Sequence, residues 1–284
     1  MLNWLLDPLS YAFMQRGLLA AVLVGILCAV IGCYVVLRSM AFLGDALAHA
    51  ILPGVAIAYL LGSNLLLGAL VAALIVALSI SFVSRKGEVK EDTAIGILFS
   101  AALALGVALI SSIRTYAVDL SHILFGDVLG VSSTDLLLIG ILTAVVLGCL
   151  LILYRPLLVV SFDPVLATTL RLPTGLLRSS LLILLSISIV VSLQTVGIGL
   201  VAAMLVTPGA TASLLTRRLP IMMALAGFLG ALSSVTGLYL SYYLNIVSGS
   251  AIVLVATLFF LLAFFFAPQR GLVWQAIHRR SAVK

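Results

Sequence analysis

The sequence predicts an all-α protein, a polytopic membrane bundle of about nine transmembrane helices that forms a single domain over residues 1–284. Hydrophobic residues make up 64% of the chain and charged residues only 8%, whereas soluble domains carry about 25% charged residues. The mean hydropathy is +1.36. Apolar stretches of about 20 residues, the length that crosses the hydrocarbon core of a bilayer, recur along the whole chain. These observations indicate an integral membrane protein.

Nine apolar stretches are long enough to be transmembrane spans. The sixth and seventh are separated at "QTVGIG", which supplies the polar residues and glycines that a tight turn needs. The predicted spans are residues 17–37, 40–62, 64–84, 92–112, 133–154, 179–196, 197–216, 220–243 and 248–268.

The basic residues test this layout, because Lys and Arg are enriched in the cytoplasmic loops of membrane proteins. With an external N-terminus and a cytoplasmic C-terminus, only Arg16 and Arg114 fall on the outer side. The other bases, all on the cytoplasmic side, are Arg38, Arg85, Lys86, Lys90, Arg155, Arg171, Arg178, Arg217, Arg218, Arg270, Arg279, Arg280 and Lys284. Since the bases are scattered between apolar stretches and form no single patch, they indicate topology, and nucleic acid is excluded as a partner.

Two loops are long enough to hold structure of their own. The external loop 114–134 surrounds an apolar "HILFG" core and predicts a short helix lying at the outer surface. In the cytoplasmic loop 155–178, Ser161 and Asp163 are helix-start signals and Pro164 suits a first helical turn, so a helix is expected from Pro164 to about Leu170. A short helix held between two spans has the form of a docking element. The alternative is a connecting loop with no partner.

Asp45 and His49 lie four residues apart inside the second predicted span, "MAFLGDALAHAILPGV". On an α-helix, residues at i and i+4 project from the same face. An Asp at the centre of a membrane helix costs about 2.5–3.5 kcal/mol, which a partner, a water-filled cavity or a bound cation must offset. A carboxylate oxygen and an imidazole nitrogen suit Mn²⁺, Fe²⁺ or Zn²⁺ in transit. Two alternatives remain: an Asp–His hydrogen bond that tightens the helix, and a proton relay in a secondary transporter.

Two further features have a structural and a functional interpretation. Asp119 and His122 lie in the external loop and are candidate ligands at the mouth of a pathway, although a solvated loop histidine is the favoured interpretation. Pro208 and Gly209, in "VTPGATASLLT", predict a kink or a break in the seventh span. Such a kink suits a gate and is equally compatible with an inert helix.

The motifs that are absent from the sequence argue against an enzyme. The chain has no GxxxxGK[ST] phosphate loop, so it hydrolyses no nucleotide by that route, and it has neither GxSxG nor HExxH. Cys28, Cys33 and Cys149 all fall within apolar spans without CxxC spacing. They are therefore expected to be packing residues and not members of a disulfide framework or a metal site.

Five segments resemble, in order, the motifs of the manganese, zinc and iron permease family of bacterial ATP-binding-cassette importers, and they cover nearly the whole chain. They read "VVLRSMAFLGDALAHAILPGVAIAYLLG" (35–62), "EDTAIGILFSAALALGVALIS" (91–111), "DLSHILFGDVLGVSSTDL" (119–136), "SFDPVLATTLRLP" (161–173) and "VGIGLVAAMLVTPGATASLLT" (196–216).

The resemblance implies the function and the partners. It implies a permease of the bacterial plasma (inner) membrane, with a fold similar to the vitamin B12 type of importer. The permease would form a homodimer, bind a cytoplasmic dimer of ATP-hydrolysing subunits and receive metal from an extracytoplasmic metal-binding protein. No cofactor is expected to be bound permanently. The transported ion is expected to be Mn²⁺, because the segment "SHILFG" is more similar to manganese-type members than to zinc-type members. The alternatives are Zn²⁺ and Fe²⁺. The rival hypothesis is a proton-coupled secondary metal carrier that works alone.

The resemblance also assigns roles to residues. It places the family's metal-coordinating Asp and His on Asp45 and His49. It also places the helix that couples to the ATPase on the segment containing Asp163, Pro164, Leu166 and Leu170. One departure weakens the assignment of His122, because the family often carries Asp directly before this histidine and here that position is Ser121.

Overall fold

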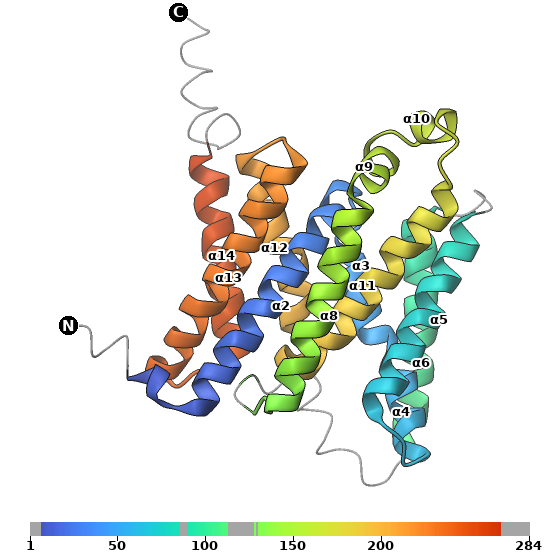
Figure 1. Cartoon of the computed structure of the whole chain (residues 1–284). Helices are drawn as coiled ribbons and strands as arrows, with labels where there is room; N and C mark the ends of the chain where they lie inside the picture. Colours follow the sequence, from blue (N-terminus) through green and yellow to red (C-terminus); the bar gives the residue numbers. More distant parts are fainter. Residues whose placement is uncertain (1–6, 86–89, 113–127, 129, 268–284) are drawn as a thin grey trace, which may run out of the picture.

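The computed structural model describes residues 7–85, 90–112, 128 and 130–267, and this part of the chain is helical, without a strand. The helices cross one another as a bundle (Figure 1). The long ones are α2 (Ala12–Leu37), α5 (Leu65–Arg85), α6 (Glu91–Ser111), α8 (Ser133–Ile152), α11 (Thr174–Val196), α12 (Ile198–Leu215), α13 (Leu219–Leu244) and α14 (Ser248–Phe266). The short ones are η1 (Pro8–Ser10), α3 (Phe42–Ala50), α4 (Leu52–Leu60), α9 (Tyr154–Phe162) and α10 (Pro164–Thr169).

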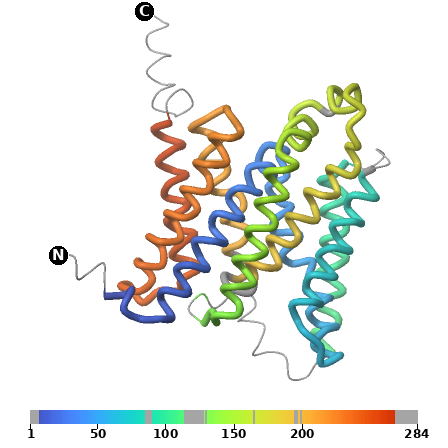
Figure 2. Tube along the Cα trace, in the orientation of Figure 1, coloured from blue at the N-terminus to red at the C-terminus, as the bar shows by residue number. Residues whose placement is uncertain are grey.

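Helix α2 lies at the centre of the bundle and packs against α13, α12 and α8. On one side α13 and α14 pack together, and on the other α4, α5 and α6 form a second group that α11 joins to the centre (Figures 1 and 2). Helix α3 packs between these groups, against α6 and α12. The core is almost entirely apolar, with serines and threonines as its buried polar residues among those described.

The nine predicted spans fall on the observed helices. Eight helical segments are long and apolar enough to cross a membrane, and the ninth prediction corresponds to α12, whose apolar part Leu200–Leu215 is shorter. The predicted turn between the sixth and seventh spans is confirmed at Gly197, which ends α11 with a φ of 79°. A residue with a side chain is disfavoured at such a φ, which explains the glycine.

The second predicted span differs from the expectation, because it is two helices and not one. Helix α3 ends and α4 begins on either side of Ile51. Pro53 is the physical reason: it has no N–H to donate into the preceding turn, and its ring crowds the carbonyl of His49 four residues earlier. The break at Ile51 therefore lies two residues after His49.

Of the two outcomes predicted at Pro208, a kink or a break, the break is not found, since α12 continues through this residue. Neighbouring helices hold membrane helices together at prolines, and here the backbone of α2 lies against the next residue: a Cβ placed on Gly209 would be 3.3 Å from the Cys33 nitrogen. In the loop after α8, the helix predicted from Pro164 is confirmed as α10, whereas α9 was not predicted. The helix expected at the outer surface lies largely outside the described residues.

Helix α3 is held in place by close contacts around Leu205 of α12. A Cβ on Gly32 of α2 would overlap the Leu205 backbone, and a Cβ on Gly44 of α3 would stand 2.9 Å from the Leu205 Cδ1 atom. Small residues allow helix backbones to approach this closely in membranes. The two glycines therefore fix the distances of α2 and α3 from α12, and with them the position of the polar pair on α3.

We predict that Gly32→Ala destabilises the protein by about 1–3 kcal/mol, because overpacking a tight contact forces the helices apart. The control is Gly96→Ala in α6, where an added Cβ would meet no atom within 4 Å. Thermal unfolding in detergent should show a lower Tm for Gly32→Ala and an unchanged or raised Tm for Gly96→Ala. Equal Tm values for Gly32→Ala and the wild type would show that the α2–α12 contact is not as tight as described.

The helix order also tests the predicted topology. The α10 end of the bundle, where α2, α5 and α12 finish and α9 and α10 lie, carries all the described bases that were predicted to be cytoplasmic (Figure 1). The opposite end, which we call the α4 end, carries the starts of α2 and α8 and the α4–α5 turn.

We predict that single cysteines at the two ends label from opposite sides of the membrane. In a variant without Cys28, Cys33 and Cys149, Ser133→Cys at the start of α8 and Arg217→Cys between α12 and α13 introduce exposed thiols. A membrane-impermeant maleimide added to intact cells should label Ser133→Cys alone, and both after lysis. Labelling of both variants in intact cells would refute the topology.

Candidate functional site

The polar pair predicted from the sequence is brought together on α3. The Oδ1 atom of Asp45 lies 3.6 Å from Nε2 of His49, and the side chains are 42% and 27% exposed, respectively. Residues on either side of the pair are buried, including Gly44, Ala46 and Ala48. Helix α3 therefore turns one polar face outward from an otherwise buried segment.

Two aromatic residues border this face. Phe99 of α6 lies beside His49, with ring centroids 6.2 Å apart, and packs edge-on against Phe42, with centroids 5.6 Å apart. Phe42 precedes Asp45 by three residues and His49 by seven, so the three share one side of the helix. Beyond Ala50, an apolar groove of about 450 Å³ continues between α4, α5 and α6. The pair is thus an isolated polar patch on an apolar face.

The separation of the pair can be compared with that of a hydrogen bond and with that of two ligands to a shared cation. At 3.6 Å the two atoms are too far apart for a hydrogen bond, whose N–H···O distance is about 2.7–3.2 Å. Two adjacent ligands with bonds of about 2.1 Å to one divalent ion stand roughly 3.0–3.4 Å apart, close to the observed spacing. Within the described residues, no third His, Cys, Asp or Glu completes a set of three ligands.

The second predicted site, α10, has an apolar outer surface. The Asp163 side chain caps the helix, because Oδ1 accepts a hydrogen bond of 2.9 Å from the backbone N–H of Leu166. Ala167 is fully buried and anchors the helix, whereas Val165, Leu166 and Leu170 are exposed. A capped helix that presents three aliphatic side chains at one end of the bundle is suited to contact another protein.

The other sequence candidates cannot be placed. Asp119 and His122 lie outside the described residues, and so does the side chain of Pro164, although the backbone of Pro164 begins α10.

A third polar cluster was not predicted as a site. Glu91, the first residue of α6, accepts a hydrogen bond of 2.7 Å at Oε1 from Nε of Arg178 and pairs at Oε2 with Nη2 of the same arginine. Nη2 of Arg38 lies 3.7 Å from Glu91 Oε2. Burial lowers the pKa of Arg38 from its ordinary value, and the carboxylate of Glu91 opposes this shift. Sequence reasoning interpreted both arginines only as topology signals.

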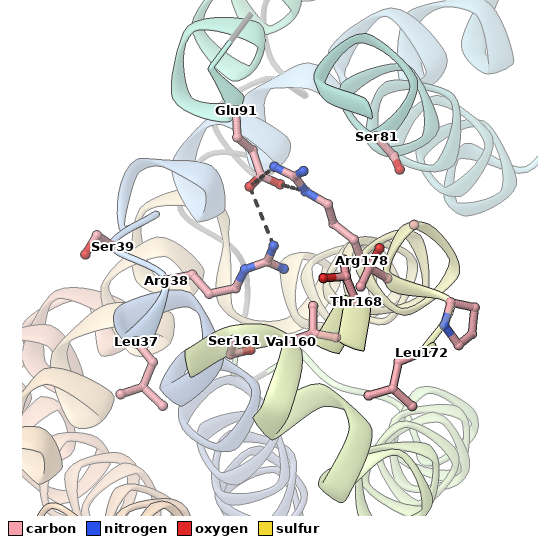
Figure 3. A pocket seen from close by; sticks show the side chains of 13 residues that line it. Leu37, Arg38, Ser39, Ser81, Glu91, Val160, Ser161, Thr168, Leu172 and Arg178 are labelled. Carbon is pink, nitrogen blue, oxygen red and sulfur yellow. Dashed lines mark hydrogen bonds and ion pairs between the residues drawn. The ribbon is translucent and has the colours of Figure 1, made fainter. Parts of the chain in front are cut away.

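These three side chains line a cavity of about 810 Å³ at the α10 end (Figure 3). Its walls come from the α2–α3 turn, α5, α6, α9, α10 and the start of α11. Ser161 in the last turn of α9 also lines the cavity, and its buried Oγ has no hydrogen-bond partner within the described part of the chain. A clue to the cluster in the sequence is that two acidic residues, Glu91 and Asp92, stand at the start of the fourth span, at the same membrane boundary as two of the bases.

Residues 10–267 match the model of the ABC 3 transport family. The manganese transport system membrane protein MntC of Halalkalibacterium halodurans is 52% identical over 265 residues, which cover 93% of this chain and 91% of that protein. A probable iron transport system membrane protein of Haemophilus influenzae is 41% identical over 273 residues, which cover 96% of each chain. Among solved structures, PsaBC from Streptococcus pneumoniae in complex with Fab matches with a TM-score of 0.85 and 39% identity, covering 99% of this chain and 100% of that chain.

Proposed function

The chain belongs to the ABC 3 transport family, and on this premise we propose that it is the membrane-spanning permease subunit of an ATP-binding-cassette importer for divalent transition metal ions, with manganese as the transported ion. The names of the relatives support manganese, since the relative from Halalkalibacterium halodurans is a manganese transport protein at 52% identity. The relative named for iron is less similar, at 41%. Iron and zinc are therefore the ions to compare with manganese in a test.

We propose that Asp45 and His49 bind the ion as it passes through the membrane. The observation that carries this proposal is the 3.6 Å separation of Asp45 Oδ1 from His49 Nε2 on the open face of α3. This geometry supports two ligands to one cation better than it supports a hydrogen bond. A carboxylate oxygen and an imidazole nitrogen are ligands that Mn²⁺, Fe²⁺ and Zn²⁺ all accept.

The exposure of the pair indicates what covers it. Asp45 is 42% exposed in the first turn of α3, within a predicted membrane span, and an ionised carboxylate that faced lipid there would be unfavourable. A second copy of the chain, placed with its own α3 opposite, would cover this face. It would also provide two carboxylates and two imidazoles to one ion. The homodimer therefore accounts both for the open face and for the absence of a third ligand among the described residues of one chain.

The remaining partners follow from the two ends of the bundle. We infer that the α10 end faces the cytoplasm, because it carries the described bases that the positive-inside rule assigns there, and that the N-terminus is outside. The capped α10 then docks into a separate ATP-hydrolysing subunit in the plasma membrane of a bacterium, and an extracytoplasmic protein delivers the metal at the α4 end. A proton-coupled carrier would need no docking helix, so the apolar surface of α10 favours the importer.

We predict that Asp45→Asn and His49→Ala each abolish manganese uptake while the complex still assembles. Asn keeps the size of Asp45 but removes its charge, and Ala removes the imidazole nitrogen. Asp92→Asn is the matched control, because Asp92 is an exposed acidic residue in the first turn of α6. Uptake of ⁵⁴Mn into proteoliposomes, divided by the amount of assembled complex, is the measurement, with unlabelled Fe²⁺ and Zn²⁺ as competitors.

In this experiment a structural role for the pair gives a different result, since expression and residual uptake would fall together. Wild-type uptake per complex in Asp45→Asn would rule out the ligand role. Competition by Zn²⁺ or Fe²⁺ at lower concentrations than Mn²⁺ would change the identity of the transported ion and leave the permease assignment intact.

We also predict that Leu166→Asp prevents binding of the ATPase subunit, because it places a charge in an apolar contact. The control is Leu61→Asp, the same change at an exposed leucine at the α4 end. Co-purification of the ATPase subunit should be lost with Leu166→Asp and retained with Leu61→Asp. Retained co-purification and uptake with Leu166→Asp would contradict docking through α10.

A further inference from the structure

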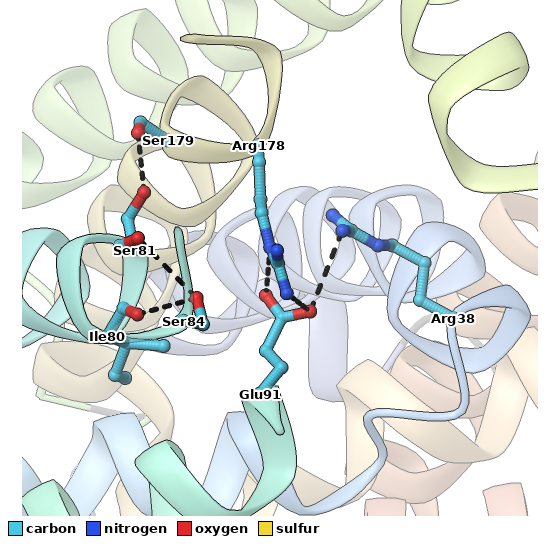
Figure 4. A network of polar contacts seen from close by, with 7 residues as sticks. All are labelled: Arg38, Ile80, Ser81, Ser84, Glu91, Arg178 and Ser179. Atoms are coloured by element: carbon cyan, nitrogen blue, oxygen red, sulfur yellow. Dashed lines mark hydrogen bonds and ion pairs between the residues drawn. The ribbon is translucent and has the colours of Figure 1, made fainter. Parts of the chain in front are cut away.

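The ion-pair cluster at the α10 end is asymmetric. Glu91 holds Arg178 through two contacts, one of them a hydrogen bond of 2.7 Å, but holds Arg38 through a single ion pair of 3.7 Å (Figure 4). The side chains of Arg38 and Glu91 are only 12% and 14% exposed, so solvent contributes little to their stabilisation. Within the described residues, the guanidinium of Arg38 has no hydrogen bond, and most of its five N–H donors are unused.

The tightly bound half of the cluster belongs to one rigid group of helices. Arg178 lies near the start of α11, and the next residue, Ser179, forms a hydrogen bond of 2.7 Å with Ser81 of α5. Figure 4 shows the serine pair beside the Glu91–Arg178 pair. These contacts tie α11 to both α5 and α6. Helix α10 is joined to the start of α11 by the short segment 170–173.

The loosely bound arginine stands at the entrance to the helix that carries the polar pair. Arg38 is the C-cap of α2, and Asp45 follows it by seven residues. The intervening turn is a Schellman motif, in which the N–H groups of Ser39 and Met40 donate to the carbonyls of Val36 and Val35. Ser39 has a φ of 56°, a left-handed conformation that is unusual for a residue other than glycine. The turn before α3 is thus under backbone strain.

The segment between α10 and α11 forms the same motif, with a left-handed residue after the helix end. The N–H groups of Arg171 and Leu172 donate to the carbonyls of Thr168 and Ala167, and Arg171 has a φ of 54°. At the other end of the bundle the left-handed positions belong to Gly62 and Asn245, and glycine and asparagine are the residues that adopt this conformation most readily. Strained turns of this kind persist where the surrounding structure holds them and concentrate at sites that change conformation.

The wall of the same cavity contains a candidate second acceptor for Arg38. Ser161 is the second-last residue of α9, two residues before Asp163, which caps α10. Its buried hydroxyl oxygen has no hydrogen-bond partner within the described residues. In Figure 3 the Arg38 side chain lies between Glu91 and Ser161. Arg38 and Ser161 line the same cavity of about 810 Å³. A loosely held guanidinium and an unpartnered hydroxyl on the α9–α10 side are therefore two groups that a movement of α9 and α10 could bring together.

We propose that Arg38 is a positioning residue that alternates between Glu91 and Ser161, so that a movement of α10 changes the position of α3 and of the polar pair it carries. In the arrangement described, Arg38 pairs with Glu91. When the ATPase subunit displaces α10, Ser161 moves with it and accepts a hydrogen bond from Arg38, and the ion pair with Glu91 opens. This proposal rests on the proposed function, because it assumes that α10 contacts the ATPase and that α3 binds the ion.

The test measures how much manganese is taken up for each ATP hydrolysed by the complete complex in proteoliposomes. Glu91→Gln and Ser161→Ala each remove one of the two alternatives, and each should lower uptake per ATP by about tenfold, a typical size for coupling between two sites. Asp92→Asn, one residue from Glu91 in the same turn, is the matched control and should leave the ratio unchanged. In an Arg38→Gln background, the added Ser161→Ala change should cause no further loss.

The outcomes separate the possible failures. If Glu91 and Ser161 are merely structural, complex yield falls but uptake per ATP stays at the wild-type value, and the proposal is wrong. If Glu91→Gln does not assemble, Ser161→Ala alone decides, since loss of an unpartnered hydroxyl should not prevent folding. Additive losses in the Arg38→Gln background would also overturn the proposal. Absence of manganese-dependent uptake in the wild-type complex would instead refute the proposed function.

Discussion

The constraint on which the rest of this structure depends is the high free energy of a charge without a partner in hydrocarbon. The chain has few charges, and its described bases collect at the helix ends, where water and headgroups solvate them. Glu91 reaches inward at one membrane boundary and is neutralised by two arginines. Asp45 lies within a predicted span with a histidine as its neighbour and, among the described residues, no arginine or lysine paired with it. Under the proposed function, this is the part of the fold where function would outweigh stability.

Much of the fold could be predicted from the sequence, because the bilayer accepts only apolar segments whose backbone polar groups are satisfied internally. The spans, the turn at Gly197 and the capped helix after Asp163 all depend on local signals: apolar length, a glycine and a side-chain cap. The polar pair was also predictable, since two residues at i and i+4 must share a helix face. Local signals did not fix the effects of the prolines. Helices α3 and α4 are separate around Pro53, whereas α12 is continuous through Pro208.

The cluster around Glu91 shows what local signals leave out. Arg38, Glu91 and Arg178 are far apart in the sequence, and each has a sufficient local explanation, two as topology signals and one as an acidic residue at the start of a helix. Only the packing of α11 against α5, and of α3 against α6, brings them to one cavity. The same is true of Ser161, which is a plausible helix-start signal in the sequence, while the structure gives that role to Asp163 alone. Residues with an adequate local role can thus hide a second, tertiary one.

Helix α3 has the properties of a segment that moves as a unit. It is nine residues long, begins after a strained left-handed turn at Ser39 and ends at the break before Pro53. Backbone changes at these two points would shift Asp45 and His49 together and preserve their spacing. Under the proposed function, two ligands from each chain would hold an ion only moderately, and a transport site must bind well enough to admit the ion and weakly enough to release it. If the proposed function holds, a short helix with a break at each end and close glycine packing to α12 at Gly44 would let a movement at the α10 end alter the relation between two copies of the pair without separating either one.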